Sequence, residues 1–310
     1  MSLAQAAVLT CFKSTAIVPV PKLSSPTMPE RPPPSLNEPW RKISWGDKLK
    51  DLQYVQKYQP EHSNIKSLRI LLYGPVGAGK SSFINSVSNI LRGRMSIPAA
   101  ASATTSDKSF TTRYETHKIR KGKGQPKTFY PFVFNDIMGL EEGSDAGVSA
   151  EDIKLVMKGH VREGHKFNPV SPLSDRDRGY NPDPAPDDKV HVLVCVISAN
   201  SAETKHSVLE KISNIRETAA DLGIPQMGLI TNIDAACGET EKDVKNVYKS
   251  KHLKKKMTDF SSAVGIPVNC IFPVKNYSHE IDINNDVDSL ILSALRRMID
   301  FGDDYIENMP

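Results

Sequence analysis

Eight consecutive residues from Gly74 to Ser81 combine glycines, a lysine and a serine in a spacing that suits phosphate binding. Their sequence, GPVGAGKS, matches the pattern G-x-x-x-x-G-K-[ST] at every fixed position. Glycines let successive backbone N–H groups converge on one phosphate, and a helix that begins there adds partial positive charge. The Lys80 ammonium can then reach the outer phosphates of a nucleotide, and the Ser81 hydroxyl can bind Mg²⁺. A chance glycine turn before a helix is the alternative interpretation.

The segments on either side of this loop have the strand and helix patterns that the motif requires. Leu68 to Tyr73 is a short apolar run typical of a buried strand, and the apolar residues from Ser81 to Leu91 fall on one helical face. We therefore predict a loop that binds a nucleoside triphosphate and in which Lys80 is catalytic. The predicted phosphate-binding residues are Gly74, Pro75, Val76, Gly77, Ala78, Gly79, Lys80, Ser81 and Ser82.

A metal-orienting aspartate is predicted at the end of another strand-like run. Asp136, Ile137, Met138 and Gly139 give the pattern D-x-x-G after the apolar stretch Phe132–Asn135. In this position Asp136 can orient Mg²⁺ through water, and the Gly139 N–H can contact the γ-phosphate. The alternative is a turn from strand to helix in which Asp136 acts as a cap.

The threonine that would cover the γ-phosphate is ambiguous. Thr104, Thr105, Thr111 and Thr112 all lie between the phosphate loop and Asp136. We favour Thr104 or Thr105, because the other two belong to a strand-like run, and we assign Thr105 to catalysis and to the metal site. The predicted metal ligands are therefore Ser81, Thr105 and Asp136.

Base recognition is predicted at Thr231-Asn232-Ile233-Asp234, which follows a later strand-like run. GTPases commonly have [NT]-K-x-D here, and the aspartate accepts hydrogen bonds from the N1–H and 2-amino groups of guanine, which adenine cannot offer. Asn232 stands where the lysine is expected, so we predict GTP specificity with weakened affinity. The predicted base contacts are Thr231, Asn232 and Asp234, with Lys275 from the loop after the last strand-like run, which matches the usual S-A-K loop poorly. A turn aspartate is the alternative.

From residue 67 onward, strand-like and helix-like segments alternate, which indicates an α/β fold. The predicted strands are Ser67–Tyr73, Phe110–Ile119, Thr128–Asn135, Val190–Ala199, Gln226–Ile233 and Cys270–Val274. The predicted helices are Lys80–Leu91, Ala150–Gly164, Lys205–Leu222, Glu239–Phe260 and Val287–Phe301. We predict a P-loop NTPase fold of the Ras-like GTPase type, with a mostly parallel sheet, one antiparallel strand and helices on both faces.

The chain divides by composition into three predicted parts. Residues 1–38 include a proline-rich stretch and are predicted to form a disordered arm. Residues 39–66 are predicted to form a helical lead-in that packs on the domain through two nearby tryptophans. Residues 67–310 are predicted to form the GTPase-like domain, with a surface insertion at the proline-rich residues 167–188.

The bulk composition argues against several classes of protein. A net charge of +4 over 310 residues is too small to argue nucleic-acid binding, and no apolar run approaches the ~18 residues of a membrane span. The four cysteines show no metal-ligand spacing and favour a reducing compartment, so we expect a cytoplasmic protein. Seven lysines from Lys242 to Lys256 could bind an anionic partner, although a solvated helix face is the simpler interpretation.

Several separate segments, in the same order, resemble the interferon-induced protein 44 family over roughly Pro39 to Pro310. The matching text is GPVGAGKSSF with its helix, D-x-x-G-L at Asp136–Leu140, LILSALRRM at Leu290–Met298, the Pro39-Trp40-Arg41 opening and Lys166-Phe167-Asn168-Pro169. The resemblance implies a cytoplasmic GTP-binding protein of the interferon-induced antiviral response. Mammalian members of this family carry an additional N-terminal domain, for which residues 1–38 are too short, so we expect a short form.

Hydrolysis is predicted to be slow. Ras-like enzymes have a glutamine directly after D-x-x-G that orients the attacking water, and this chain has Leu140 there. One hypothesis is a slow GTPase or a switch between GTP and GDP. A second is a GTP-binding scaffold without useful hydrolysis, and a third, disfavoured by Asp234, is an ATPase. Dimerisation across the nucleotide face could supply a missing catalytic group, and the sequence identifies no protein partner.

Overall fold

The computed structural model describes residues 35–46, 48–62, 64–96, 113–143, 146–200 and 205–309. The contacts within the chain separate two units, Met1–Pro32 and Pro33–Pro310, and all of the described residues belong to the second unit. Most of the predicted arm, residues 1–34, lies outside the described residues. Ordered contacts begin before Pro39, since the Leu36 N–H donates to the Lys249 carbonyl over 2.8 Å.

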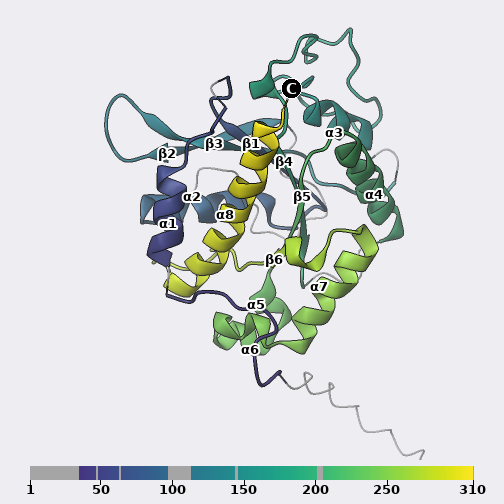
Figure 1. Cartoon of the computed structure of the whole chain (residues 1–310). Coiled ribbons are helices and arrows are strands. Elements are labelled where there is room, and N and C mark those ends of the chain that lie inside the picture. Colours follow the sequence, from purple (N-terminus) through teal and green to yellow (C-terminus); the bar gives the residue numbers. More distant parts are fainter. Residues whose placement is uncertain are drawn as a thin grey trace, which may run out of the picture. The chain divides into compact units, whose positions relative to one another are not determined.

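The described residues of the second unit form one six-stranded sheet (Figure 1). Its strands are β1 (Leu68–Tyr73), β2 (Glu115–Lys121), β3 (Thr128–Asp136), β4 (Val192–Ser198), β5 (Gln226–Thr231) and β6 (Ile271–Pro273). They lie in the order β2-β3-β1-β4-β5-β6, with β2 antiparallel to β3 and every other neighbouring pair parallel. The predicted P-loop GTPase fold, with its single antiparallel strand, is confirmed.

The central strands are buried on both faces. Leu68, Ile70 and Leu72 of β1 belong to one apolar cluster, and Leu71 and Tyr73 of the same strand belong to another. Successive side chains of a strand point to opposite faces, so each face of the sheet has its own core. This is why the central strands read as near-continuous apolar runs in the sequence.

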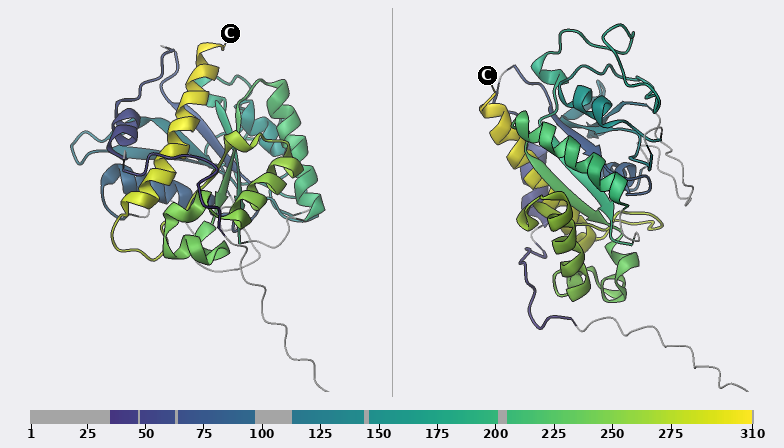
Figure 2. Two further views of the ribbon diagram at one scale, coloured as in Figure 1. Left: turned by 60° about the horizontal axis from the view of Figure 1, so that its bottom comes forward. Right: turned by 90° about the vertical axis from the view of Figure 1, so that its right-hand side faces the viewer.

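Helices cover both of these faces (Figures 1 and 2). The α-helices are α1 (Lys48–Lys57), α2 (Lys80–Arg92), α3 (Ala150–Met157), α4 (His206–Asp221), α5 (Ile233–Ala236), α6 (Gly238–Lys242), α7 (Lys251–Val264) and α8 (Asn285–Glu307). Short 3₁₀ helices occupy Pro186–Asp188, Val244–Tyr248 and Val268–Cys270. The buried apolar residues of α1 and α2, and all of those of α8 except Leu290, belong to the cluster on one face. Those of α3, α4 and α7 belong to the cluster on the other face.

The segment predicted as a single helix, Glu239–Phe260, is divided in the structure. Asp243 accepts a hydrogen bond from the Lys245 N–H (3.0 Å), and Ser250 accepts one from the Leu253 N–H (3.2 Å). Each of these side chains caps the start of a new helix, because it satisfies an N–H that has no partner within the helix. The lysines of the predicted cluster therefore lie in α6, in the 3₁₀ helix Val244–Tyr248, at Lys249 and in α7, and do not share one helix.

Other predicted boundaries also move for local reasons. Helix α3 ends at Met157, well before the predicted Gly164, because the chain turns at Gly159, whose φ is +83°. A side chain at Gly159 would begin 3.0 Å from the Asp188 carbonyl oxygen, so the turn requires glycine. Strand β2 begins at Glu115, later than predicted, and residues 97–112 lie outside the described part of the chain.

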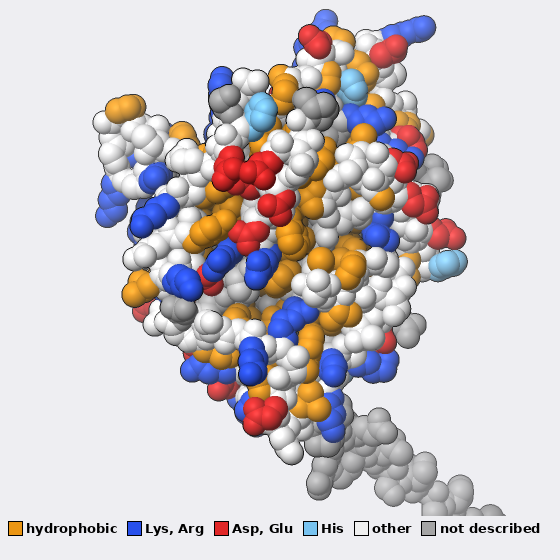
Figure 3. Space-filling model, viewed as in Figure 1, with side chains coloured by type: hydrophobic (Ala, Val, Ile, Leu, Met, Phe, Trp, Pro, Cys, Tyr) orange, Lys and Arg blue, Asp and Glu red, His pale blue; other side chains and the backbone are white. Residues whose placement is uncertain are grey.

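The lead-in before β1 is held against α8. The Lys48 ammonium pairs with Asp288 (2.5 Å), and the Tyr58 hydroxyl donates to Asp303 (2.9 Å). Trp40 packs edge-to-face on Tyr248, with 5.4 Å between the ring centroids. Figure 3 shows acidic side chains gathered on the face that carries α8. The N-terminal part of the second unit is thus fixed by specific polar contacts as well as by apolar packing.

A buried histidine joins the insertion to the amino-terminal edge of the sheet. His191 is fully buried just before β4; its Nδ1 accepts a hydrogen bond from the Arg69 N–H (2.9 Å), and its Nε2 contacts the Pro186 carbonyl (3.1 Å). Burial lowers the pKa of His191 to about 4, so the ring is neutral at pH 7. In the neutral form, with the proton on Nε2, both ring nitrogens have partners.

Candidate nucleotide-binding site

The predicted phosphate loop connects β1 to α2 at the carboxyl edge of the sheet. Its glycines have positive φ angles: +142° at Gly74, +73° at Gly77 and +87° at Gly79. A Cβ at Gly74 would lie 2.1 Å from the Val196 carbonyl oxygen, so the loop backbone sits directly on β4. All three positions favour glycine for conformation, and Gly74 and Gly79 also leave no room for a Cβ, as a loop that exposes its N–H groups to phosphate needs.

Lys80 is the first residue of α2 and lies within the loop. Its ammonium donates to the carbonyls of Gly74 and Pro75, each over 3.1 Å. Burial lowers the pKa of Lys80, and the nearby Asp136 carboxylate opposes that shift. The ammonium is therefore held beside the loop backbone, where outer phosphates would bind.

Ser81 and Asp136 meet, although they are far apart in the sequence. Ser81 follows Lys80 in α2, and Asp136 ends β3, which pairs with β1. The Ser81 hydroxyl donates to Asp136 Oδ2 over 2.5 Å. A hydroxyl and a carboxylate are suitable oxygen donors for Mg²⁺, which is typically bound by one or two carboxylates together with phosphate oxygens. The described residues contain no cluster of three or more His, Cys, Asp or Glu side chains that could hold a metal ion.

The D-x-x-G-L segment is paired to the phosphate loop through its backbone. The Leu140 N–H donates to the Gly74 carbonyl (3.0 Å), and the Val76 N–H donates to the Leu140 carbonyl (3.3 Å). A Cβ at Gly139 would lie 2.6 Å from a methyl of Val76, so the glycine permits this close approach. The Leu140 side chain is 2% exposed and belongs to the core. Residue 140 therefore contributes backbone contacts to the site and a side chain to the core.

The base-side residues lie at the end of β5, which begins with Gln226 and ends with Thr231, and in the segment after it. The Thr231 hydroxyl contacts the carbonyls of Ala78 (2.7 Å) and Ile197 (3.1 Å), so it links the phosphate loop to β4. Asn232 adopts a left-handed conformation with φ of +52°, and its side-chain amide donates to the Ser198 hydroxyl (2.9 Å). Asp234 lies in α5. The structure thus joins Thr231 to the phosphate loop and Asn232 to the end of β4 by side-chain contacts that the motif alone does not reveal.

The segment after β6 connects the base side to the phosphate side. Asn276 donates through Nδ2 to the Gly79 carbonyl (3.1 Å), and the Tyr277 N–H donates to the Ser86 hydroxyl (3.0 Å). Ser86 is fully buried in α2 and donates in turn to the Ser82 carbonyl (2.8 Å). Sequence reasoning missed Asn276 and Ser86, because no motif marks them.

Two further residues border the loop. A hollow of about 180 Å³ is lined by Pro75, Val76, Gly77, Ala78, Ser198 and Asn200. Ser198 and Asn200 were not predicted as site residues, although their place at the carboxyl end of a central strand could have identified them, since ligands of open α/β sheets bind at that edge. Thr104 and Thr105, like Thr111 and Thr112, lie outside the described residues.

Comparison with known proteins shows which proteins this chain resembles. A family model described as "50S ribosome-binding GTPase" matches residues 69–232. The chain is 32% identical over 260 residues to interferon-induced protein 44 of Homo sapiens and 30% identical over 257 residues to the human interferon-induced protein 44-like protein. These alignments cover 84% and 83% of this chain, but only 57% and 56% of the two relatives. The chain therefore spans little more than half the length of the curated relatives that it matches.

Two solved structures of Toc33 from Arabidopsis thaliana also match over 83% of this chain and 92% of Toc33. A dimerization-deficient mutant gives a TM-score of 0.48 at 13% identity, and a complex with GDP and Mg²⁺ gives 0.47 at 14% identity. In the part of the chain that the structure describes, no helix is both long and apolar enough to cross a membrane.

Proposed function

The chain belongs to the GTPase family whose model matches residues 69–232, and from that premise we propose that it binds GTP and GDP with Mg²⁺ and hydrolyses GTP slowly. Its similarity to interferon-induced protein 44 confirms the resemblance found in the sequence. We propose that it acts in the cytoplasm, in the interferon-induced antiviral response that this resemblance implies.

The convergence of Lys80, Ser81 and Asp136 is the observation that carries this proposal. Three groups suited to phosphates and Mg²⁺ meet at one edge of the sheet, and the predicted guanine-binding Asp234 follows a strand at the same edge. Lys80 would bind the β- and γ-phosphates as a point charge, while the loop N–H groups orient them. Mg²⁺, when bound with the nucleotide, would neutralise phosphate charge, and Ser81 and Asp136 would hold it.

Slow turnover is supported by the burial of Leu140. The residue that orients water in Ras-like enzymes is a glutamine, whereas Leu140 offers no polar group and packs in the core. The same observation favours a second candidate function, a GTP-binding scaffold without useful hydrolysis. Self-association through the nucleotide face could supply the missing group, and activity per molecule would then rise with protein concentration.

Measuring nucleotide affinity and single-turnover hydrolysis tests these proposals. We expect GTP and GDP to bind more tightly than ATP, and Mg²⁺ to strengthen the binding of GTP. Equal affinities for GTP and ATP would remove Asp234 from the site and revive the ATPase hypothesis. Hydrolysis should then be measured across protein concentrations, with and without Mg²⁺. Fast multiple turnover by the monomer, independent of concentration, would contradict both the slow GTPase and the scaffold.

A further inference from the structure

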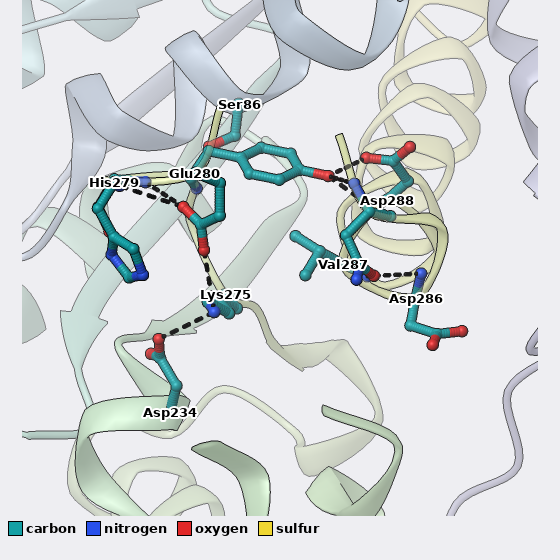
Figure 4. A network of polar contacts seen from close by, with 11 residues as sticks. Ser86, Asp234, Lys275, His279, Glu280, Asp286, Val287 and Asp288 are labelled. Carbon is teal, nitrogen blue, oxygen red and sulfur yellow. Dashed lines mark hydrogen bonds and ion pairs between the residues drawn. The ribbon is translucent and has the colours of Figure 1, made fainter. Parts of the chain in front are cut away.

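A loop after β6 places two charged side chains beside the predicted base contacts. Strand β6 pairs in parallel with β5, with Pro273 opposite Ile230, so the segments that follow the two strands leave the sheet side by side. One of these segments carries Lys275 and Glu280, and the other carries Asp234. Figure 4 shows Lys275 lying between the two carboxylates.

The distances show which carboxylate holds Lys275 more strongly. The ammonium lies 3.0 Å from Glu280 Oε1 and 3.5 Å from Asp234 Oδ2. Both contacts are ion pairs, and because the attraction between charges weakens with distance, the pairing with Glu280 is the stronger. The Lys275 and Glu280 side chains are 18% and 19% exposed, so solvent screens their pairing only in part.

Backbone hydrogen bonds hold the Glu280 carboxylate in position independently of its contact with Lys275. Its Oε2 accepts hydrogen bonds from the N–H groups of Ser278 (2.9 Å) and His279 (3.2 Å), which leaves Oε1 for the ammonium. Burial opposes the charge of this carboxyl, but the backbone N–H groups and Lys275 outweigh it and lower the pKa of Glu280 to about 2. Glu280 is therefore ionised at neutral pH and has a fixed position.

Because Asn232 replaces the lysine of the usual motif, the segment that carries Asp234 does not place a lysine beside it. The usual motif has a lysine two residues before the guanine-binding aspartate, whereas the Asn232 amide is short and already donates to Ser198. Lys275 brings an ammonium and an aliphatic stem to the same aspartate from the neighbouring strand.

We infer that Lys275 supplies the cation that Asn232 cannot, and that Glu280 is a positioning residue that keeps Lys275 from closing on Asp234. This inference rests on the proposed binding of guanine nucleotides. An ionised carboxylate has several lone-pair positions, so Asp234 can bind both guanine donors while the ammonium stands off at its present distance. Without Glu280, Lys275 has Asp234 as its remaining partner in the triad and competes with the guanine N1–H and 2-amino groups.

The test measures GTP and XTP affinities for the parent, Glu280→Gln, Lys275→Met and the double variant. XTP carries a carbonyl in place of the 2-amino group, so a lysine that closes on Asp234 weakens GTP binding and spares XTP. We expect Glu280→Gln to weaken GTP binding about tenfold and to lower the preference for GTP over XTP. In the Lys275→Met background, the same substitution should change nothing further. Glu241→Gln, an exposed substitution with the same charge change, is the control.

Each remaining outcome has a definite meaning. If Glu280→Gln binds GTP and XTP with the same affinities as the Glu241→Gln control, the inference is wrong. It is also wrong if Glu280→Gln weakens GTP binding equally with and without Lys275, because Glu280 would then act on the fold alone. Glu280→Asp, which keeps the charge but shortens its reach, should give an intermediate effect if Glu280→Gln does not fold. A parent that does not prefer GTP to ATP would overturn the proposed function and this inference together.

Discussion

On the phosphate side of the candidate site, the chain positions groups mainly through its backbone. The Leu140 N–H bonds to the Gly74 carbonyl, and glycines provide the space for close approach. On the base side, the contacts join side chains: Asp234 to Lys275, and Lys275 to Glu280. The phosphate loop rests on the buried core, whereas these three side chains are each about a fifth exposed.

This difference predicts different consequences of substitution. Backbone contacts and glycines depend on the surrounding core, so changes near the phosphate loop should alter affinity strongly or destabilise the fold. Side chains at the partly exposed base site can be changed with little effect on the core, so substitutions there should mainly alter the choice of nucleotide.

Lys80→Ala should have the largest effect on binding. Loss of a desolvated ammonium next to the phosphates should weaken GTP binding about a thousandfold, or ~4 kcal/mol. Calorimetric titration with GTP measures this loss, and chemical denaturation should show that the fold persists. Lys66→Ala removes an exposed lysine just before β1 and should bind GTP like the parent. If Lys80→Ala keeps the parental affinity, the phosphate-loop assignment is wrong.

His191 lies at the amino-terminal edge of the sheet, opposite the candidate site. Its substitution therefore tests the stability of the fold without changing the site. Its pKa is about 4 in the folded protein and its ordinary value is 6.5, so the unfolded chain takes up a proton first as pH falls. The stability associated with neutral His191 is complete above pH 7 and declines from about pH 6.5 towards pH 4, by roughly 3 kcal/mol. Denaturation of the parent and of His191→Asn across this range measures the effect. Identical pH dependence in the two proteins would contradict the assignment.

Leu140→Gln tests whether residue 140 belongs to the core. The structure places this side chain in the apolar cluster, so a glutamine amide would be buried among apolar groups. We expect the free energy of unfolding to fall by roughly 2 to 3 kcal/mol, without a gain in GTP hydrolysis. Leu140→Met preserves an apolar side chain of similar volume and should cost less than ~1.5 kcal/mol. Faster hydrolysis in a stable Leu140→Gln protein would show that residue 140 faces the nucleotide.

Asp234→Asn tests the base side directly. An amide presents a donor to a guanine edge that also donates, so GTP affinity should fall about thirtyfold, or ~2 kcal/mol. Discrimination against XTP should relax, and the free energy of unfolding should stay close to that of the parent. Competition among GTP, XTP and ATP measures selectivity in one experiment. A variant that still prefers GTP as strongly as the parent would show that Asp234 does not bind the base.

Asn232→Lys should have the smallest effect, although it restores the residue that the motif lacks. The backbone at Asn232 has a φ of +52°, which asparagine tolerates better than lysine, and the substitution also removes the bond to Ser198. We expect a loss of about 1 kcal/mol in stability and less than a threefold change in GTP affinity. Asn232→Gly also removes the bond to Ser198, but glycine adopts a positive φ without strain. The difference in stability between the two variants therefore measures the cost of the backbone conformation. A large gain in GTP affinity would contradict this account.

The backbone geometry of the phosphate side follows from the sequence more directly, because that side depends on local features. A glycine pattern between a strand and a helix implies backbone geometry directly, and the strand order then brings Asp136 to Ser81. The base side depends on pairs that are distant in sequence, such as Asp234 with Lys275 and Asn276 with Gly79. Their contacts follow from the pairing of β5 with β6, which no local pattern specifies.

The errors in helix boundaries have the same origin. Lysine-rich residues after Glu239 favour helix throughout, but caps at Asp243 and Ser250 divide the segment. The early end of α3 depends on Gly159 meeting Asp188, a contact with the insertion. Local propensity therefore located the helices, and contacts between distant residues decided where they begin and end.

The buried Ser86 hydroxyl has a thermodynamic consequence. It accepts from the Tyr277 N–H on the base side and donates to the Ser82 carbonyl on the phosphate side, so one hydroxyl bridges the two halves of the site. Ordering either half should then reduce the entropy that the other half loses on binding. We therefore expect intact GTP to bind more favourably than the summed binding free energies of guanosine and tripolyphosphate, measured separately. This excess should remain after the entropic advantage of the covalent link between the two parts is subtracted. In Ser86→Ala that excess should shrink, and the nucleotide would behave more like two independent ligands.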